Sequence, residues 1–214
     1  ERQQEEFKLK KQHSRTLYLT QLGVLTAVLL LLEVTGLGMI KTFGLEMTIL
    51  QVPVIVGAIL LGPSGGAILG LVFGLISFAE CFGKSQFGVT LLAIQPFFTF
   101  LVCVPTRTLM GWCCGMIFRW LHRVIPKSKN MLAFVLASLS GALLNTIFFM
   151  GTLCLCFYRT DYIQSLVAYY GASNFLMFIV LMVGVQGLIE ALLCTVLGSG
   201  ISKGVYHALY RKSA

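Results

Sequence analysis

Apolar residues gather in long runs along the chain, and short polar stretches separate these runs. A helix needs about 20 predominantly apolar residues to cross a bilayer. The pattern predicts six such segments, and the second of them is short for a full crossing. They cover residues 16–39, 48–61, 66–82, 89–109, 131–158 and 175–197. We therefore expect an all-α integral membrane protein with six transmembrane helices.

The polar ends of the chain set the expected domain organisation. We expect residues 1–15 to form a polar N-terminal segment, residues 16–208 the six-helix membrane domain, and residues 209–214 a tail. The head before the first apolar run is too long and too mixed for a usual signal peptide, and no small-x-small cleavage site follows the run. We interpret this run as a retained first membrane helix.

The composition narrows the class of protein further. Hydrophobic residues make up 57% of the 214 residues and charged residues 11%, whereas soluble domains are about a quarter charged. This balance excludes a disordered protein, a coiled coil and an ordinary soluble enzyme. The seven cysteines lie in or beside apolar runs and include no CxxC pair. We interpret them as packing residues, rather than as a disulfide framework or a metal site.

The net charge of +8 is distributed unevenly. Twelve of the sixteen basic residues fall in the head, the connection after the fourth segment and the tail, namely Arg2, Lys8, Lys10, Lys11, Arg15, Arg119, Arg123, Lys127, Lys129, Lys203, Arg211 and Lys212. Only Lys41, Lys84 and Arg159 fall in the other connections. Because cytoplasmic loops carry an excess of Lys and Arg, this asymmetry predicts that both termini are cytoplasmic. Two cytoplasmic termini require an even number of crossings.

Small residues recur at a spacing of four. The third segment and the turn before it carry Gly62, Gly66, Gly70 and Gly74, and the first segment carries Gly23 and Ala27. Residues four apart share one face of a helix, so these faces allow another helix to approach closely. Packing within the chain explains the spacing. Docking of another subunit explains it equally well, and the sequence leaves both interpretations open.

Polar side chains collect in the half of the segments that we expect to face outward. This outer set comprises Glu33, Gln51, Glu80, Lys84, Gln95, Asn145 and Arg159. Further inward, Gln186 and Glu190 lie one turn apart on the sixth segment, and we expect Arg107 to snorkel or to pair with Glu190. The pattern indicates a small polar pocket that opens outward. It is not a continuous line of charge, which argues against an ion channel or a proton pump.

The extension of the fourth segment has a basic face. Arg119, His122 and Arg123 share this face, and Trp112 and Trp120 flank the cytoplasmic end of the segment. Basic residues with neighbouring tryptophans are typical of a helix at the membrane surface. We interpret the extension as an interfacial helix in contact with anionic lipid.

Motifs for catalysis are weak. The chain has no Walker A motif, no GxGxxG after a strand and no HExxH. Gly62-Pro63-Ser64-Gly65 suggests the alternative of an intramembrane serine protease with Ser64 as the nucleophile. The three histidines, His13, His122 and His207, all fall at expected cytoplasmic ends, where a helix-borne base is not expected. We therefore interpret Ser64 as a turn residue and expect neither catalysis nor a cofactor.

Two stretches of sequence resemble a known family. The first runs from Met47 to Ser77 and contains Leu61-Gly62-Pro63-Ser64-Gly65-Gly66-Ala67, and the second is Leu144-Asn145-Thr146 followed by Phe148 and Phe149. Both resemble the S components of energy-coupling factor (ECF) vitamin transporters, and in particular the pantothenate-type branch. S components are six-helix, substrate-binding membrane subunits. The resemblance extends over nearly the whole chain.

The resemblance implies a function and a set of partners. An S component of the bacterial cell membrane binds one vitamin near the outer surface and tips in the membrane to deliver it. A transmembrane scaffold (T) protein and two cytoplasmic ATPases supply the energy, which agrees with the missing Walker A motif. The family docks on the scaffold through Ala-x-x-x-Ala in the first helix, and Gly23 and Ala27 occupy those positions here. Gly62, Gly66 and Gly70 are further docking candidates.

Pantothenate is the expected substrate. It carries a carboxylate, hydroxyls and an amide, and so needs a cation and neutral hydrogen-bonding groups. Lys84 or Arg159 would meet the carboxylate. The remaining candidates for the polar groups are Gln51, Gln95, Asn145 and Gln186. Hydroxymethylpyrimidine, riboflavin or another vitamin stays open as the ligand, and so does a non-transporting scaffold role.

Overall fold

The structure is a computed structural model of the 214-residue chain. It describes the backbone of residues 2–41, 46–126 and 130–210, and the side chains of residues 15–38, 48–126, 131–184 and 187–208. The described residues form seven α-helices and one antiparallel hairpin. The elements are α1 (Arg2–Val34), β1 (Met39–Lys41), β2 (Glu46–Thr48), α2 (Gln51–Glu80), α3 (Gln86–Ile94), α4 (Pro96–Val124), α5 (Asn130–Phe157), α6 (Asp161–Tyr169) and α7 (Phe175–Tyr210).

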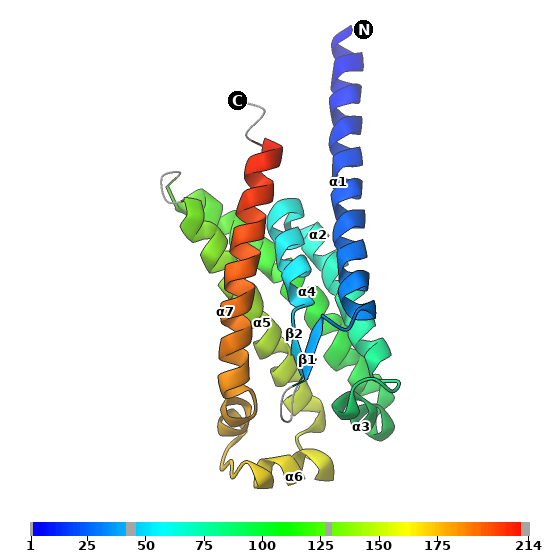
Figure 1. The fold of residues 1–214 in the computed structure, drawn as a ribbon, viewed down its shortest axis with the longest axis vertical. Coiled ribbons are helices and arrows are strands. Elements are labelled where there is room, and N and C mark those ends of the chain that lie inside the picture. The colour runs from blue at the N-terminus through cyan, green and yellow to red at the C-terminus, as the bar shows by residue number, and fades with distance from the viewer. Residues whose placement is uncertain (1, 42–45, 127–129, 211–214) are drawn as a thin grey trace.

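The long helices lie side by side in a bundle, with α1 along one edge (Figure 1). The N-terminal end of α1 and the C-terminal ends of α4 and α7 lie at one end of this bundle, which we call the termini end. The short helices α3 and α6 and the β1–β2 hairpin lie toward the opposite end, the hairpin end.

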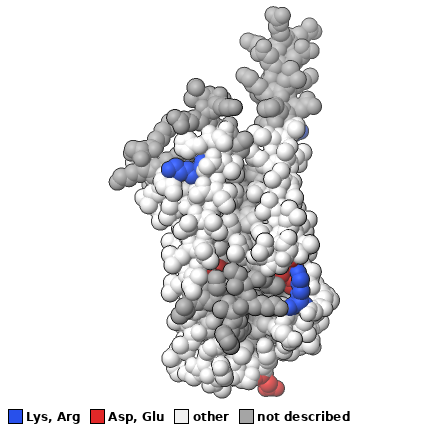
Figure 2. Space-filling model, in the orientation of Figure 1, with Lys and Arg blue, Asp and Glu red and all other residues white. Residues whose placement is uncertain are grey.

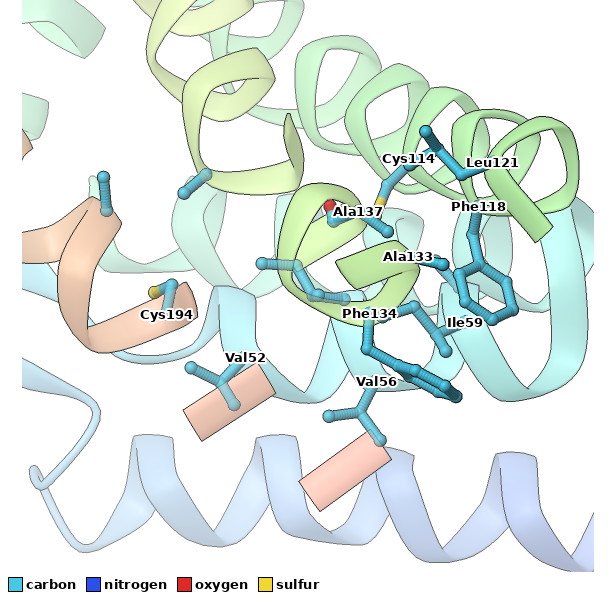
Figure 3. Packing of buried hydrophobic residues seen from close by; sticks show 14 residues of the cluster. Val52, Val56, Ile59, Cys114, Phe118, Leu121, Ala133, Phe134, Ala137 and Cys194 are labelled. Atoms are coloured by element: carbon cyan, nitrogen blue, oxygen red, sulfur yellow. Dashed lines mark hydrogen bonds between the residues drawn. The ribbon is translucent and has the colours of Figure 1, made fainter. Parts of the chain in front are cut away.

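The hydrophobic core joins α2, α4, α5 and α7. Close to the termini end, Ile59 of α2, Phe118 of α4 and Phe134 of α5 point toward one another (Figure 3). Phe134 is fully buried, and its ring lies 5.2 Å from that of Phe118. In contrast, Leu29 is the one buried residue among the described side chains of α1. The first helix therefore contributes little to the hydrophobic core.

The turn predicted between the second and third apolar segments is present. Gly62 has φ 79° and ψ −170°, a backbone conformation that glycine adopts readily, and Pro63 follows it. The two arms of α2, residues 51–61 and 63–80, fold back on each other. Gly66 of the second arm lies so close to the first arm that a Cβ added to it would be 2.7 Å from the Cβ of Ala58. At 1.5 Å per residue the first arm is about 16 Å long, which is short for a crossing.

Among the described residues, five helices are long and apolar enough to cross a membrane, and the whole of α2 counts as one of them. A shorter apolar stretch lies at Phe175–Gly184, within α7. The protein is thus an all-helical membrane protein apart from its small hairpin. Six crossings and two cytoplasmic termini stay predictions.

The stripe of glycines on α2 packs against α4. Gly66 and Gly70 face the carbonyl oxygens of Gly111 and Arg107, and neither position has room for a Cβ. A Cβ on Gly74 would lie 2.7 Å from the Cα of Val104. These glycines let two helix backbones touch over several turns.

Three local predictions need correction. The fourth segment is expected to begin at residue 89 as one helix, but the chain breaks at Gln95 into α3 and α4. Gln95 is extended, with φ −154° and ψ 95°, because it precedes Pro96, which disfavours the helical conformation in the residue before it. The β1–β2 hairpin and α6 form where the sequence predicts only connections between apolar segments. Thr160 caps α6 by accepting a hydrogen bond from the amide of Ile163 at 3.5 Å.

Candidate functional site

A charged side chain lies inside the bundle. Arg107 of α4 is 6% exposed and lies about 16 Å along the helix from Pro96. Its guanidinium donates hydrogen bonds to the Val102 carbonyl at 2.8 Å and to the Thr106 hydroxyl at 3.3 Å. Its Nε has no hydrogen-bond partner among the described residues. The interior of the bundle therefore holds a cation with an unused donor.

Two aromatic rings and two carboxylates surround this guanidinium. Its central carbon lies 4.3 Å from the ring centroid of Phe149 on α5 and 5.4 Å from that of Phe73 on α2. Cation–π attraction of this kind is stronger in a site without water. Glu80 and Glu190 are near enough to attract the guanidinium electrostatically. The rings hold the charge between α2, α4 and α5.

Arg107 does not snorkel, and its interaction with Glu190 is an electrostatic attraction without a direct ion pair among the described side chains. Its side chain is buried inside the bundle. A charge inside an apolar segment is itself a signal of function, and this signal could have placed Arg107 in the site.

A second polar contact connects α2 and α7. Gln51 is 1% exposed, and its Nε2 donates to Oε1 of Glu190 at 2.6 Å. Its own Oε1 has no hydrogen-bond partner among the described residues. Glu190 also interacts electrostatically with Arg107, so the three side chains belong to one region. We call Gln51, Arg107 and Glu190 the interior polar cluster. It offers both an unused donor and an unused acceptor.

Asn145 of α5 belongs near this cluster. It is half-buried and lies one helical turn before Phe149, whose ring contacts Arg107. Residues four apart share a helix face, so Asn145 is on the face of α5 that carries this ring. Gln186 lies on α7 one turn before Glu190, but its side chain is outside the described residues.

The other predicted residues lie at the hairpin end. Lys84 is 54% exposed and forms an ion pair with Glu33, the second-to-last residue of α1. The Lys84 ammonium also donates to the Glu33 carbonyl at 3.3 Å, and the hydrogen bond to the Glu33 carboxylate raises the pKa of Lys84. Gln95 and Arg159 are exposed. Of the predicted residues, the structure thus joins Gln51 to Glu190 and places Asn145 on the helix face of Phe149, whereas Lys84, Gln95 and Arg159 lie apart from them.

Comparisons with known proteins give the family. The family model for the ECF transporter substrate-specific component matches residues 17–202. The chain belongs to this family. An S component of this kind is a substrate-binding subunit of a transporter, not an enzyme. Together with the long apolar helices, the match makes this S component a multi-pass protein of the bacterial plasma membrane.

One curated relative of this S component has an assigned substrate. The chain is 30% identical over 128 residues to the pantothenic acid transporter PanT of Lactococcus lactis subsp. cremoris (strain MG1363). The alignment covers 55% of this chain and 61% of PanT. The match therefore spans less than two thirds of the relative.

The two candidate docking faces of the S component differ in exposure. Gly62, Gly66 and Gly70 are buried, and α4 covers the last two. Gly23 and Ala27 on α1 are exposed, and a Cβ added to Gly23 would have no heavy atom within 4 Å. The docking hypothesis therefore applies to the exposed face with Gly23 and Ala27.

Other chemistry finds no support in the described part of the S component. No group of three or more His, Cys, Asp or Glu side chains there is placed to hold a metal ion. Ser64 is exposed in the turn of α2, and no hydrogen bond joins its hydroxyl to a histidine among the described side chains. The described part of the chain therefore gives no support to the serine-protease alternative. On the face shown in Figure 2, the described residues are mostly neutral, as expected for a protein surrounded by lipid.

Proposed function

We propose that this S component binds pantothenate from the outside and passes it inward. A T protein and two cytoplasmic ATPases would drive the delivery, during which the S component tips in the membrane. The family match supports the class of protein, and the PanT relative supports the substrate. The observation that carries the proposal is the buried guanidinium of Arg107 with its unused Nε donor.

The chemistry of the interior polar cluster suits this ligand. A carboxylate would pair with Arg107, because charge-assisted hydrogen bonds are the strongest available in a dry site. The unused Oε1 of Gln51 would accept from a hydroxyl, and the amide of Asn145 would meet the ligand amide. We assign the carboxylate to Arg107 in preference to Lys84, whose ammonium is held by Glu33, and to Arg159, which is exposed.

The orientation in the membrane is part of the same proposal. Arg119 and Arg123 lie at the termini end, as do the N-terminal end of α1 and the C-terminal end of α7. A cytoplasmic termini end would satisfy the preference of basic residues for that side. The two arms of α2 would then count as separate segments, giving six, with residues 1–15 and 209–214 outside the membrane domain of residues 16–208. The substrate would enter from the hairpin end.

The first experiment measures pantothenate binding by calorimetry on the detergent-purified S component. We expect Arg107→Gln to weaken binding roughly 10- to 100-fold, because it removes a hydrogen bond to a charged group. The matched control is Arg119→Gln, which removes a charge from the same helix at the termini end and should leave the affinity unchanged. Thermal unfolding of each variant tests whether the fold survives.

A second variant separates binding from folding. Arg107→Met removes the charge but keeps much of the volume, and replacing a buried charge by an apolar side chain is often neutral or stabilising. We expect it to lose pantothenate binding while its melting temperature holds or rises. Normal affinity in Arg107→Met would contradict the site. Binding of hydroxymethylpyrimidine or riboflavin in place of pantothenate would keep the class and replace the substrate.

A further inference from the structure

A basic pocket lies at the termini end, beside the last residues of the first α2 arm. Its volume is about 370 Å³, and it lies between the Gly62 turn and the last turns of α4. Aliphatic residues 59–61 and the ring of Phe118 form its apolar lining, and Arg119, His122 and Arg123 form its polar lining. Arg119 lies about 18 Å along α4 from Arg107, so the pocket is separate from the interior polar cluster.

The conformation of the turn determines where one of these charges lies. Nη2 of Arg119 lies so close to Gly62 that a Cβ there would be 2.6 Å away. Only a glycine at φ 79° both makes this turn and admits the guanidinium. His122 stacks on Phe118 with ring centroids 5.6 Å apart and meets the edge of Tyr206 at 6.2 Å. Packing therefore orients two of the three polar side chains.

The charge of this pocket is not neutralised within the described residues. Neither Arg119 nor Arg123 forms an ion pair there, since the one ion pair among described side chains joins Glu33 to Lys84. Both arginines are exposed. Two cations and a histidine thus face an open pocket, which favours an anion.

The surroundings of the pocket are apolar. Trp120 is 62% exposed, and Met116 and Val124 on the same helix are also exposed. Tryptophans are enriched at the level of lipid headgroups. A cationic pocket with an apolar lining, beside an exposed apolar helix surface, fits a molecule with an anionic head and a hydrocarbon tail better than a free anion.

We propose that this pocket binds the phosphate headgroup of an anionic phospholipid. Arg119 and Arg123 contact the phosphate, and the acyl chains follow the exposed side chains of α4. This proposal gives a defined site to the general lipid contact expected from the sequence. It does not depend on which vitamin the S component carries.

The test measures lipid binding to the purified chain by native mass spectrometry. The probes are phosphatidylglycerol, which is anionic, and phosphatidylcholine, which is zwitterionic. We expect tighter binding of phosphatidylglycerol. The double variant Arg119→Gln with Arg123→Gln should weaken that binding roughly 30-fold, since each basic residue near an anionic surface contributes about a factor of five.

The controls keep the charge count equal. Arg15→Gln with Lys203→Gln removes two positive charges outside the pocket and should leave phosphatidylglycerol binding unchanged. Arg119→Lys with Arg123→Lys keeps the charge and should retain most of it. Equal loss in the Arg15 and Lys203 variant would overturn a defined site. Equal binding of both lipids, or displacement of phosphatidylglycerol by millimolar inorganic phosphate, would overturn the lipid assignment.

Discussion

The small-residue faces of α1 and α2 in this S component differ in whether another helix of the chain covers them. The stripe on α2 is covered by α4, so that Gly74 has no room for a Cβ beside Val104. The face on α1 is open around Gly23, and Ala27 is exposed. The spacing of small residues is the same in both helices. Spacing alone therefore says that a helix backbone can approach, but not whether the chain itself supplies that helix.

The difference suggests a division of roles. The helices α2 and α4 pack closely, and the ring of Phe73 on α2 lies against the guanidinium of Arg107 on α4. The helix α1 contacts α2 mainly through a few apolar side chains such as Leu25 and Leu29, and its C-terminal end is bound to the loop after α2 by Glu33 and Lys84. A helix that adds little to the core is free to contact a second protein.

The largest effect is expected on the covered face. Gly74→Leu should prevent recovery of a folded, monodisperse protein, because the side chain would have to displace the α4 backbone. The smaller change Gly74→Ala should cost about 1–3 kcal/mol through overpacking. The matched control is Gly23→Ala, which should hold or raise the stability, since alanine is the better helix former. Thermal unfolding in detergent compares them, and equal melting temperatures would show that the two faces do not differ.

The next effect is on assembly. Ala27→Leu or Gly23→Leu should leave folding and pantothenate binding unchanged, because the leucine would point away from the core of the chain. The same variants should lose assembly with the T protein and the ATPases, since the leucine keeps the two helix backbones apart. Pull-down on the tagged ATPase module measures this. Normal recovery of the complex would remove α1 from the docking surface.

Local signals in the sequence predicted much of the fold. The Gly62-Pro63-Ser64-Gly65 turn was predicted because glycine and proline restrict the backbone in recognisable ways. The break at Gln95 carries an equally local signal in Pro96, but the apolar pattern runs through it and conceals it. The β1–β2 hairpin has strands of three residues, which are too short for an alternating pattern.

The site was predicted less well, because it depends on contacts between distant residues. Gln51 meets Glu190 across 139 positions, and nothing in either neighbourhood of the sequence indicates this pairing. Lys84 is engaged by Glu33 from α1, so a cation that looked available is already paired. Arg107 carried a usable signal, since a buried charge in a membrane helix is costly. Pairing with Glu190 alone does not account for this charge, because its guanidinium also contacts Phe149 and the Val102 carbonyl.

The smallest effect concerns the ion pair that binds α1 to the rest of the bundle. Glu33→Gln should lower the melting temperature only slightly, because an exposed pair contributes about 0–1 kcal/mol. The pKa of Lys84 is raised in the folded state, so its contribution is complete below the ordinary lysine pKa and is lost as the pH rises through the folded value. The wild type should therefore lose its small advantage over Glu33→Gln only in strongly alkaline solution. Melting curves at neutral and alkaline pH measure this, with Arg159→Gln as the control for an exposed charge at the same end. If Glu33→Gln lowered the melting temperature as much as Gly74→Ala, α1 would belong to the core. The contrast between the two small-residue faces would then fail.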